Sequence, residues 1–333
     1  MLNIFKKGKQ QAAILMYHRV NTAVSDTWQL CVAPKHFEQQ MEVLRDYHVV
    51  PVAQLADKKK KIPDKAVAIT FDDGYLDNYA TAKPILEQYR FPATFFITNS
   101  VGENHPEFWW DALERVLLEN NQLPAEINLQ LDGESWHFNL KKGWQHIISI
   151  DDMKQIASWL PWRTPPATQH ALFVYLSEWM KALSFQNQQL IISQLYAQTG
   201  MHASVRDSYK TVNGAQLLTL HRLPQFTVGG HSAWHTALGK FDAGVQRQAI
   251  LENKTFLETV LSAPVAGYGY AHGSYNEDSI AILQEAGYTY ACTTEEALVD
   301  AGTNAFALPR FQVKNWNGAE FKRRLEGWFK SNA

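Results

Sequence analysis

The stretch AVAITFDDGYLDNY, residues 66–79, runs from a strand-like segment with few polar side chains directly into two adjacent carboxylates, Asp72 and Asp73, and then Gly74. Asp and Gly are favoured turn residues, so the end of a strand alone would explain them. An almost wholly apolar strand is typical of a buried parallel sheet, however, and ligands bind at the carboxyl ends of such strands. Two carboxylates there can divide the work, one binding a cation and the other transferring protons. The rest of the chain has to decide between a turn and a site.

Length and charge limit the classes of protein that this chain can represent. It has 333 residues, of which 46% are hydrophobic, enough for one large domain with an insertion or for two domains. The net charge of −2 argues against nucleic acid as a partner, because a phosphate-binding surface needs a basic excess. The two cysteines, Cys31 and Cys292, are far apart and lack metal-ligand spacing.

The amino terminus, MLNIFKKGKQQAAILMYH, carries positive charges but no apolar stretch long enough for a signal peptide. Nowhere in the chain do about 18 uninterrupted apolar residues occur, so we predict no transmembrane segment. We therefore expect a soluble protein in the cytoplasm.

Apolar strands and amphipathic helices alternate along two parts of the chain, which predicts an α/β fold with a parallel sheet or barrel. Expected strands in the first part are AAILMY, HVVPV, AVAITF and PATFFIT, with helices from Pro34 and over 76–89, where Pro84 is unfavourable. The second part has helices 213–220, 243–261 and 277–286, a final helix from Gly318, and the strands FTVGG, VAGYGY, YTYACTT and FALPRF.

Between these parts the sequence changes character, with tryptophan-rich helical segments such as EFWWDALERVLLEN and MKQIASWLPW and a strand-like INLQLDGESWHFNL. We predict a barrel formed by residues 1–100 and 208–333, and a mainly helical insertion over 101–207. The tryptophans of the insertion, including Trp109 and Trp110, are explained either by its own core or by stacking on sugar rings or lipid.

A second group of polar side chains follows the expected strand FTVGG, in VGGHSAWHTAL. On a helical turn His231 and His235 would share one face, and both imidazoles would reach one ion. Two ordinary histidines at a helix start are the alternative. Together with one carboxylate of residues 72–73 they would form a three-ligand site for a divalent metal, with positions left open for water and substrate.

Several segments, taken in order, resemble the polysaccharide deacetylases of carbohydrate esterase family 4, the NodB-like group. They are AITFDDGYLDNY, PATFFI, FTVGGHSAWHTAL, GYGYAHGSYNEDSIAILQEAGYTYACTT and LPRFQV. The resemblance covers roughly residues 12–100 and 210–313 and leaves out the insertion. It implies a distorted (β/α) barrel and hydrolysis of N-acetyl or O-acetyl groups on sugars.

The resemblance also implies roles for individual residues. Asp73, His231 and His235 correspond to the metal ligands, and Asp72 corresponds to the general base. The metal would acidify water and polarise the acetyl carbonyl, and backbone N–H groups, one of them near His272, would stabilise the oxyanion. We expect zinc, with cobalt or nickel as alternatives.

The sequence departs from the family pattern at three places. Ala271 and His272 stand where a proline and an aromatic residue are usual, and the arginine of that motif is missing, so Arg310 becomes the candidate for orienting Asp72, with a plain salt bridge as the alternative. No histidine follows Arg310, whereas ILMYHRV near the start ends in His18. That arrangement resembles circularly permuted biofilm-polysaccharide deacetylases, so we assign the general acid role to His18, with His272 as the next candidate.

Three functions remain open from the sequence. The leading hypothesis is a metal-dependent deacetylase acting on an N-acetylated saccharide, in a lipid- or nucleotide-linked precursor because no secretion signal is visible. A non-haem iron oxygenase would use the same two-histidine, one-carboxylate triad. A catalytically inactive sugar-binding module is the third. The sequence does not predict the oligomeric state.

Overall fold

The computed structural model describes residues 10–23, 25–102, 105–120, 122–140, 159–165 and 168–330. Clustering of the chain separates two compact units, one of Met1–Thr22, Cys31–Val101 and Thr211–Ala333, the other of Ala23–Leu30 and Gly102–Lys210. Most of the predicted helical segment 153–162 lies outside the described residues. That the two units are independent domains, as the sequence suggested for 1–100 with 208–333 and for 101–207, stays a prediction.

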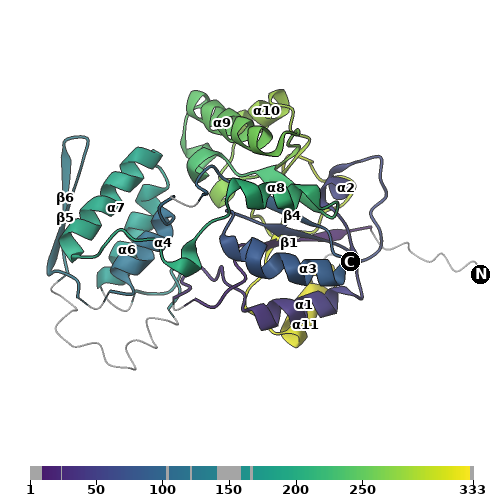
Figure 1. The fold of residues 1–333 in the computed structure, drawn as a ribbon, viewed down its shortest axis with the longest axis horizontal. Helices are drawn as coiled ribbons and strands as arrows, with labels where there is room; N and C mark the ends of the chain where they lie inside the picture. The colour runs from purple at the N-terminus through teal and green to yellow at the C-terminus, as the bar shows by residue number, and fades with distance from the viewer. Residues whose placement is uncertain are drawn as a thin grey trace, which may run out of the picture. The chain divides into compact units, whose positions relative to one another are not determined.

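The first unit is built on a curled, entirely parallel sheet that forms a half-barrel surrounded by helices (Figure 1), which confirms the predicted fold class. Its strand order is β10-β1-β3-β4-β7-β8-β9, and β2 pairs with the start of β3. The strands are β1 (Ala12–Tyr17), β2 (His48–Val49), β3 (Ala66–Phe71), β4 (Ala93–Ile97), β7 (Phe226–Gly230), β8 (Gly267–Gly269), β9 (Tyr290–Cys292) and β10 (Phe311–Gln312).

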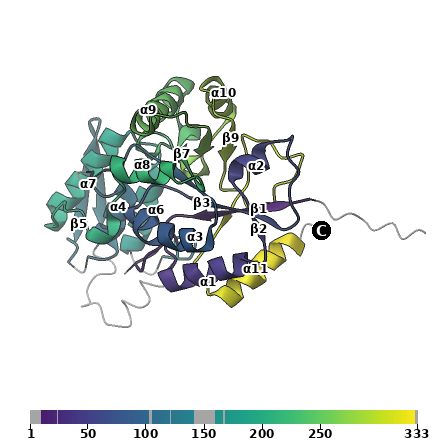
Figure 2. The same ribbon diagram turned by 45° about the vertical axis from the view of Figure 1, so that its right-hand side comes forward.

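Alternate residues of the strands pack into two different cores, as the two-residue period of a strand requires. One core contains small side chains such as Ala12, Ala66 and Ala68, together with residues of α2 (Val52–Ala56). The other contains larger ones such as Tyr17 and Phe71, and it lies under the surrounding helices. Those helices are α1 (Pro34–Leu44), α3 (Lys83–Tyr89), α8 (Gly214–Arg222), α9 (Ala243–Leu261), α10 (Glu277–Glu285) and α11 (Gly318–Lys330). Helices α1 and α11 lie side by side in both views (Figure 2).

The segment FALPRF is not the single strand that the sequence predicted. Leu308 makes an isolated parallel bridge with Cys292 of β9, and Phe311 pairs with Leu15 of β1, while Pro309 and Arg310 lie between the two pairings. Proline has no N–H to donate to a ladder, which accounts for the break. One short segment thus joins β9 to β1, and it brings Arg310 to the inside of the sheet's curve.

The helix predicted over 76–89 is irregular at the residue that the sequence marked as unfavourable. A π-helical turn at Asn78–Ala82 precedes α3, and Pro84 lies in the first turn of α3. Because proline cannot donate a backbone hydrogen bond, a widened turn before it is a common accommodation.

The second unit combines α4 (Trp109–Leu117), α6 (Thr168–Met180) and α7 (Phe185–Thr199) with an antiparallel hairpin, β5 (Glu126–Leu131) and β6 (Glu134–Asn139). Asp132 and Gly133 form the hairpin turn, both with positive φ, as a two-residue Asp-Gly turn requires.

The outer edge of β5 is covered by two glutamine side chains of α7. Gln198 accepts from the N–H of Asn128 at 2.8 Å and donates to its C=O at 2.6 Å, and Gln194 does the same at Gln130, with both distances 2.8 Å. Each side-chain amide therefore pairs with one residue of the strand as a neighbouring strand would.

Candidate active site

The two adjacent carboxylates leave the end of β3 in different directions. Asp73 adopts a left-handed backbone conformation, with φ of 75°, and both side chains are only 3% exposed. A non-glycine residue in this region is strained by about 1 kcal/mol or more. The turn therefore directs the two adjacent carboxylates towards different partners.

Asp73 meets the two histidines that follow β7. Its Oδ1 lies 3.3 Å from Nε2 of His231 and 3.1 Å from Nε2 of His235. The helical turn predicted for this pair is wrong: the segment is a short 3-10 turn in which Trp234 and His235 have φ of 58° and 55°. Left-handed backbone, and not helical periodicity, brings the imidazoles together.

The opposite nitrogens of both imidazoles are also held. Nδ1 of His231 lies 2.8 Å from the carbonyl oxygen of Gly269 on β8, and Nδ1 of His235 lies 3.1 Å from Nε2 of His272. A carbonyl oxygen only accepts, so Nδ1 of His231 carries a hydrogen, and Nε2, which faces Asp73, is the nitrogen that can bind either a proton or a cation. Histidine ligands of metal ions are oriented in this way.

Two polar residues that the sequence analysis missed fix the backbone of the histidines. Asn253, buried on α9, accepts from the N–H of His231 at 2.9 Å and donates to the carbonyl oxygen of Ile97 at 3.0 Å. Thr98, directly after β4, accepts from the N–H of His235 at 3.1 Å. An asparagine on the buried face of an otherwise amphipathic helix was the only available signal for Asn253.

The donor set fits a divalent cation. Asp73, His231 and His235 each present one ligand atom, and these atoms lie within 4.8 Å of one another. Asp73 Oδ1 is a buried acceptor that lacks a hydrogen-bond donor among the described residues. Burial raises the pKa of the Asp73 carboxyl, but the two imidazoles outweigh it and hold that pKa well below its usual range, so Asp73 is ionised. One carboxylate and two imidazoles facing each other suit zinc or a similar ion.

Asp72 is bound by a single buried arginine. Arg310, with a fully buried side chain, donates from Nη1 to Oδ1 at 2.7 Å and from Nη2 to Oδ2 at 2.8 Å, and it donates from Nε to the carbonyl oxygen of Thr293 at 2.8 Å. Burial raises the pKa of the Asp72 carboxyl, but the Arg310 guanidinium outweighs it, so the pKa is lowered. The sequence proposed this contact as one of two alternatives, and the structure places the arginine on Asp72.

His18 follows β1 and reaches the same carboxylate, with its Nε2 4.0 Å from Oδ2 of Asp72. The DDGYLDNY stretch itself holds the His18 segment: Asn78 donates to the carbonyl oxygen of His18 at 2.8 Å, and Asp77 accepts from the N–H of Val20 at 3.0 Å. Burial lowers the pKa of His18, although the neighbouring carboxylates act in the opposite direction. The sequence analysis missed the roles of Asp77 and Asn78.

The group as a whole carries an excess of negative charge, because two carboxylates face one guanidinium. Burial lowers the pKa of His231, but the Asp72 and Asp73 carboxylates outweigh it and the net pKa is raised. An environment that favours a proton on an imidazole also favours a cation in its place.

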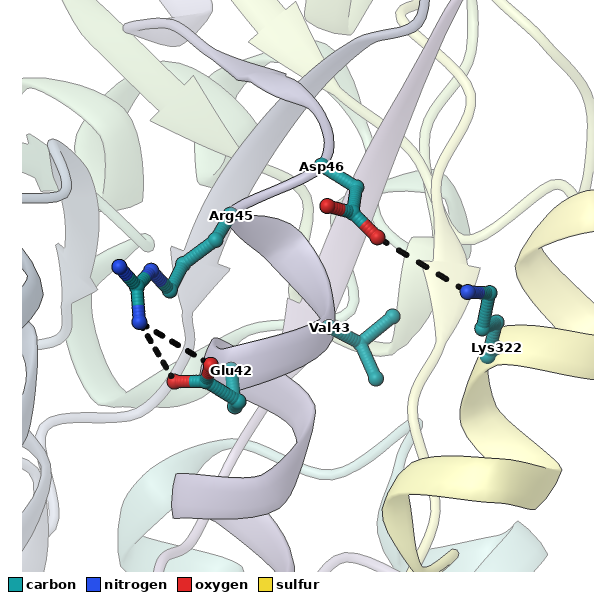
Figure 3. Close-up of a pocket in the computed structure, with 5 residues that line it drawn as sticks. All are labelled: Glu42, Val43, Arg45, Asp46 and Lys322. Atoms are coloured by element: carbon teal, nitrogen blue, oxygen red, sulfur yellow. Dashed lines mark hydrogen bonds and ion pairs between the residues drawn. The ribbon is translucent and has the colours of Figure 1, made fainter.

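A surface hollow of the same unit lies away from this cluster. It is lined by Glu42, Val43, Arg45 and Asp46 at the end of α1 and by Lys322 of α11 (Figure 3). The strand that follows, β2, pairs with the first residues of β3, so the hollow is at the amino end of the strands. Its side chains form exposed ion pairs with each other and hold none of the chemistry described above.

Comparison with known proteins gives the class of protein that this fold and cluster define. The sequence model of the polysaccharide deacetylase family matches residues 59–124 and 148–291. The chain therefore belongs to the polysaccharide deacetylase family.

Curated relatives match over shorter stretches. "Putative polysaccharide deacetylase YxkH" of Bacillus subtilis (strain 168) is 41% identical over 98 residues, which is 28% of this chain and 34% of the relative. The poly-β-1,6-N-acetyl-D-glucosamine N-deacetylase of Escherichia coli (strain K12) is 33% identical over 86 residues, 24% of this chain and 13% of the relative. The enzyme of that name from Staphylococcus aureus is 34% identical over 118 residues, 30% of this chain and 40% of the relative. The matches thus span well under half of the relatives' own length.

Solved structures match over nearly the whole chain. The deacetylase PplD of Streptococcus pyogenes, in complex with acetate, has a TM-score of 0.57 at 17% identity and covers 95% of this chain and 99% of its own. IcaB from Ammonifex degensii has a TM-score of 0.55 at 14% identity, with 97% and 98% covered. At such low identity the likeness concerns the fold.

The family match includes Asp72, Asp73, His231, His235 and His272 but ends before Arg310 and begins after His18. It also runs into the insertion, which the resemblance seen in the sequence left out. The circular permutation that the sequence suggested stays a prediction. In the structure, β1, which leads to His18, is a sheet strand between β10 and β3.

No helix in the described part of the chain is long and apolar enough to cross a lipid bilayer.

Proposed function

We propose that this chain is a divalent-metal-dependent hydrolase that removes the acetyl group from an N-acetylated saccharide. The observation that carries the proposal is the arrangement at the ends of β3 and β7. Three acceptor atoms, from Asp73, His231 and His235, face one another. A second carboxylate, Asp72, lies beside them but is held separately by Arg310.

Asp73, His231 and His235 would hold the cation, with zinc as the expected ion and cobalt or nickel as alternatives. Bound there, the cation would supply Lewis acidity, lowering the pKa of water and polarising the acetyl carbonyl. His231 and His235 are suited to this task because their Nδ1 atoms are held by Gly269 and His272, which leaves Nε2 for the ion.

Asp72 would act as the general base. Because Arg310 lowers the pKa of its carboxyl, Asp72 is ionised near neutral pH and able to accept a proton from the attacking water. The bidentate contact uses one lone pair on each oxygen, so further lone pairs remain for that water. Arg310 therefore fixes the direction from which the proton is taken.

His18 would return a proton to the departing nitrogen. In the overall reaction the water oxygen bonds to the acetyl carbon, the carbon–nitrogen bond breaks, and the nitrogen leaves as an amine once it is protonated. Nε2 of His18 is 4.0 Å from Asp72, close to the carboxylate that accepts the first proton. A positioned acid of this kind is worth about 10² to 10⁴ in rate.

The substrate class is an N-acetylated saccharide. Two of the relatives are named poly-β-1,6-N-acetyl-D-glucosamine N-deacetylases, which supports β-linked N-acetylglucosamine oligomers as the first substrates to test. The lipid- or nucleotide-linked precursor expected from the sequence, and its cytoplasmic location, stay predictions.

The test is acetate release by the chain of 333 residues. Protein freed of metal with a chelator should release no acetate from N-acetylglucosamine oligomers, sugar nucleotides or lipid-linked saccharides, and added Zn²⁺ should restore release from at least one. Asp73→Asn, which keeps the size of the side chain, should stay inactive at the same Zn²⁺ concentration. Oxygen consumption with Fe²⁺ and no acetate release would favour the oxygenase alternative, and inactivity with every substrate and metal would favour a binding module.

A further inference from the structure

The two histidines of the cluster are held by different kinds of partner. For His231 the partner of Nδ1 is the carbonyl oxygen of Gly269, part of β8, which no side-chain substitution removes. For His235 the partner of Nδ1 is the side chain of His272, with Nε2 at 3.1 Å and the rings edge to face, 4.3 Å between centroids. Only the second contact depends on the identity of a side chain.

The direction of the hydrogen bond between the two histidines follows from the proposed function, on which this inference rests. If Nε2 of His235 offers its lone pair to a cation, the single hydrogen of the neutral ring is on Nδ1. That hydrogen points at Nε2 of His272, which must then accept. His272 carries its own ring hydrogen on Nδ1.

We propose that His272 is a positioning residue for the metal ligand His235, accepting its Nδ1–H and thereby fixing both its tautomer and its ring orientation. This assignment differs from the general acid role considered for His272. While Nε2 of His272 accepts from His235, that nitrogen is unavailable to protonate a leaving group.

The backbone around His272 supports a fixed position. His272 has φ of 56°, in a short 3-10 turn of Ala271–Gly273, and histidine is one of the residues enriched in this region. Gly273 follows with φ of 64°, and a Cβ there would clash with Oγ1 of Thr294. The turn is therefore closely packed, and it holds the His272 ring against the ring of His235.

Two substitutions of similar length separate this role from packing. His272→Gln places an amide oxygen near the position of Nε2 and can still accept, whereas His272→Met cannot accept a comparable hydrogen bond. Both variants carry an unbranched side chain at the same positive φ, so they share any backbone strain. His221→Met, at the end of α8 and outside the cluster, is the control for loss of a histidine.

The measurement is the Zn²⁺ dissociation constant by competition with a chromophoric chelator, together with the thermal unfolding midpoint of the metal-free variants. Loss of an outer partner of a histidine ligand typically weakens metal binding about 10- to 100-fold. We expect that loss for His272→Met. For His272→Gln and His221→Met we expect a Zn²⁺ dissociation constant near that of the parent. Without metal, the two His272 variants should have equal thermal unfolding midpoints.

Three results would overturn the inference. If His272→Met binds Zn²⁺ as tightly as the parent, or if His272→Gln is weakened as much as His272→Met, then the acceptor at position 272 has no role, while the proposed function stands. If the parent chain itself binds none of Zn²⁺, Co²⁺ and Ni²⁺, then the proposed function fails and this inference fails with it.

Discussion

Each compact unit contains a group of buried charged side chains, and the two groups differ in their balance of donors and acceptors. In the second unit, Glu107 accepts from the main-chain N–H of Arg206 at 2.6 Å and from its Nε and Nη2 at 3.0 and 2.9 Å. At the ends of β3 and β7, one oxygen of Asp73 faces two imidazole nitrogens. Glu107 is matched by the donors of Arg206, whereas Oδ1 of Asp73 has no hydrogen-bond donor among the described residues. This difference is the basis of the cation site proposed for Asp73, His231 and His235.

The largest effect is expected when one ligand atom is removed from the cluster of Asp73, His231 and His235. His235→Ala leaves two ligands, which rarely hold a divalent ion well, so bound Zn²⁺ and acetate release should both be lost. The parent should gain about 2.7 kcal/mol of stability at a Zn²⁺ concentration one hundred times its dissociation constant, and the variant should gain none. Elemental analysis and thermal unfolding with and without Zn²⁺ measure this, and a full equivalent of zinc in His235→Ala would refute the ligand assignment.

The next effect separates proton transfer from metal binding in the same cluster. His18→Ala should reduce turnover of an N-acetyl substrate by about 10² to 10⁴, because an amine leaves poorly without a proton. An acetyl ester of an acidic phenol needs little help, so His18→Ala should hydrolyse it nearly as fast as the parent.

The control for this prediction is Asp72→Asn, which should lose both activities, while His18→Ala should keep its zinc. Equal losses of His18→Ala on amide and ester would argue against the acid role.

Breaking the ion pair between Glu107 and Arg206 should lower stability and leave metal binding unchanged. Glu107→Ala leaves Arg206 partly buried without its main partner, which should cost about 3 kcal/mol of unfolding free energy. Glu134→Ala, an exposed glutamate of β6, is the control and should cost little. Chemical denaturation measures the unfolding free energy, and Zn²⁺ titration measures the dissociation constant. Weaker Zn²⁺ binding by Glu107→Ala would contradict the prediction that this ion pair does not affect metal binding.

A buried histidine of the second unit makes the stability of the protein depend on pH. His170 of α6 is buried, its ring nitrogens have no hydrogen-bond partner among the described residues, and burial lowers its pKa to about 4. Its ordinary pKa is 6.5, so the unfolded chain takes up a proton that the folded chain refuses as the pH falls from 6.5 towards 4. The unfolding free energy should be highest above that window and fall by about 3 kcal/mol across it.

In metal-free protein, the parent should lose more unfolding free energy than His170→Leu between about pH 7.5 and about pH 5. Identical losses in the two proteins would show that His170 is protonated in the folded state.

The smallest effect is expected at an exposed ion pair. Arg247 and Glu285 are 2.7 Å apart, as close as buried Arg310 is to Asp72, but their side chains are 48% and 59% exposed. Solvent screening should limit the effect of Arg247→Ala to under about 1 kcal/mol. A loss above that in denaturant unfolding would mean that distance matters more than burial.

The sequence predicted the parallel sheet because each buried strand carries its own apolar run. Apolar runs ending in Asp72–Asp73 and before His231 place the two groups at strand ends, and parallel strands bring those ends together. The geometry of the pair His231 and His235 was predicted for the wrong reason, because positive φ at Trp234 and His235 leaves no signature in apolar periodicity.

Residues that act across the fold were harder to find. Asn253 is separated from His231 by 22 positions, and Arg310 from Asp72 by 238. The resemblance suggested Arg310 because a familiar arginine was missing, whereas the only signal for Asn253 was a polar residue on the buried face of its helix. Pro309 in FALPRF was a signal of the broken strand that the sequence analysis did not use, since proline interrupts a ladder.

The hydrogen bonds from the two glutamines of α7 to β5 match the spacing of a helix to the spacing of a strand. Four residues along an α-helix rise about 6.0 Å, and two residues along a strand advance about 6.6 Å. Gln194 and Gln198 can therefore meet Gln130 and Asn128 on successive turns with a mismatch of roughly half an ångström. Helix α7 thus fixes the position of β5 along its length. If the strand slipped by one residue, both amides would be misaligned and four backbone groups would be left unpaired.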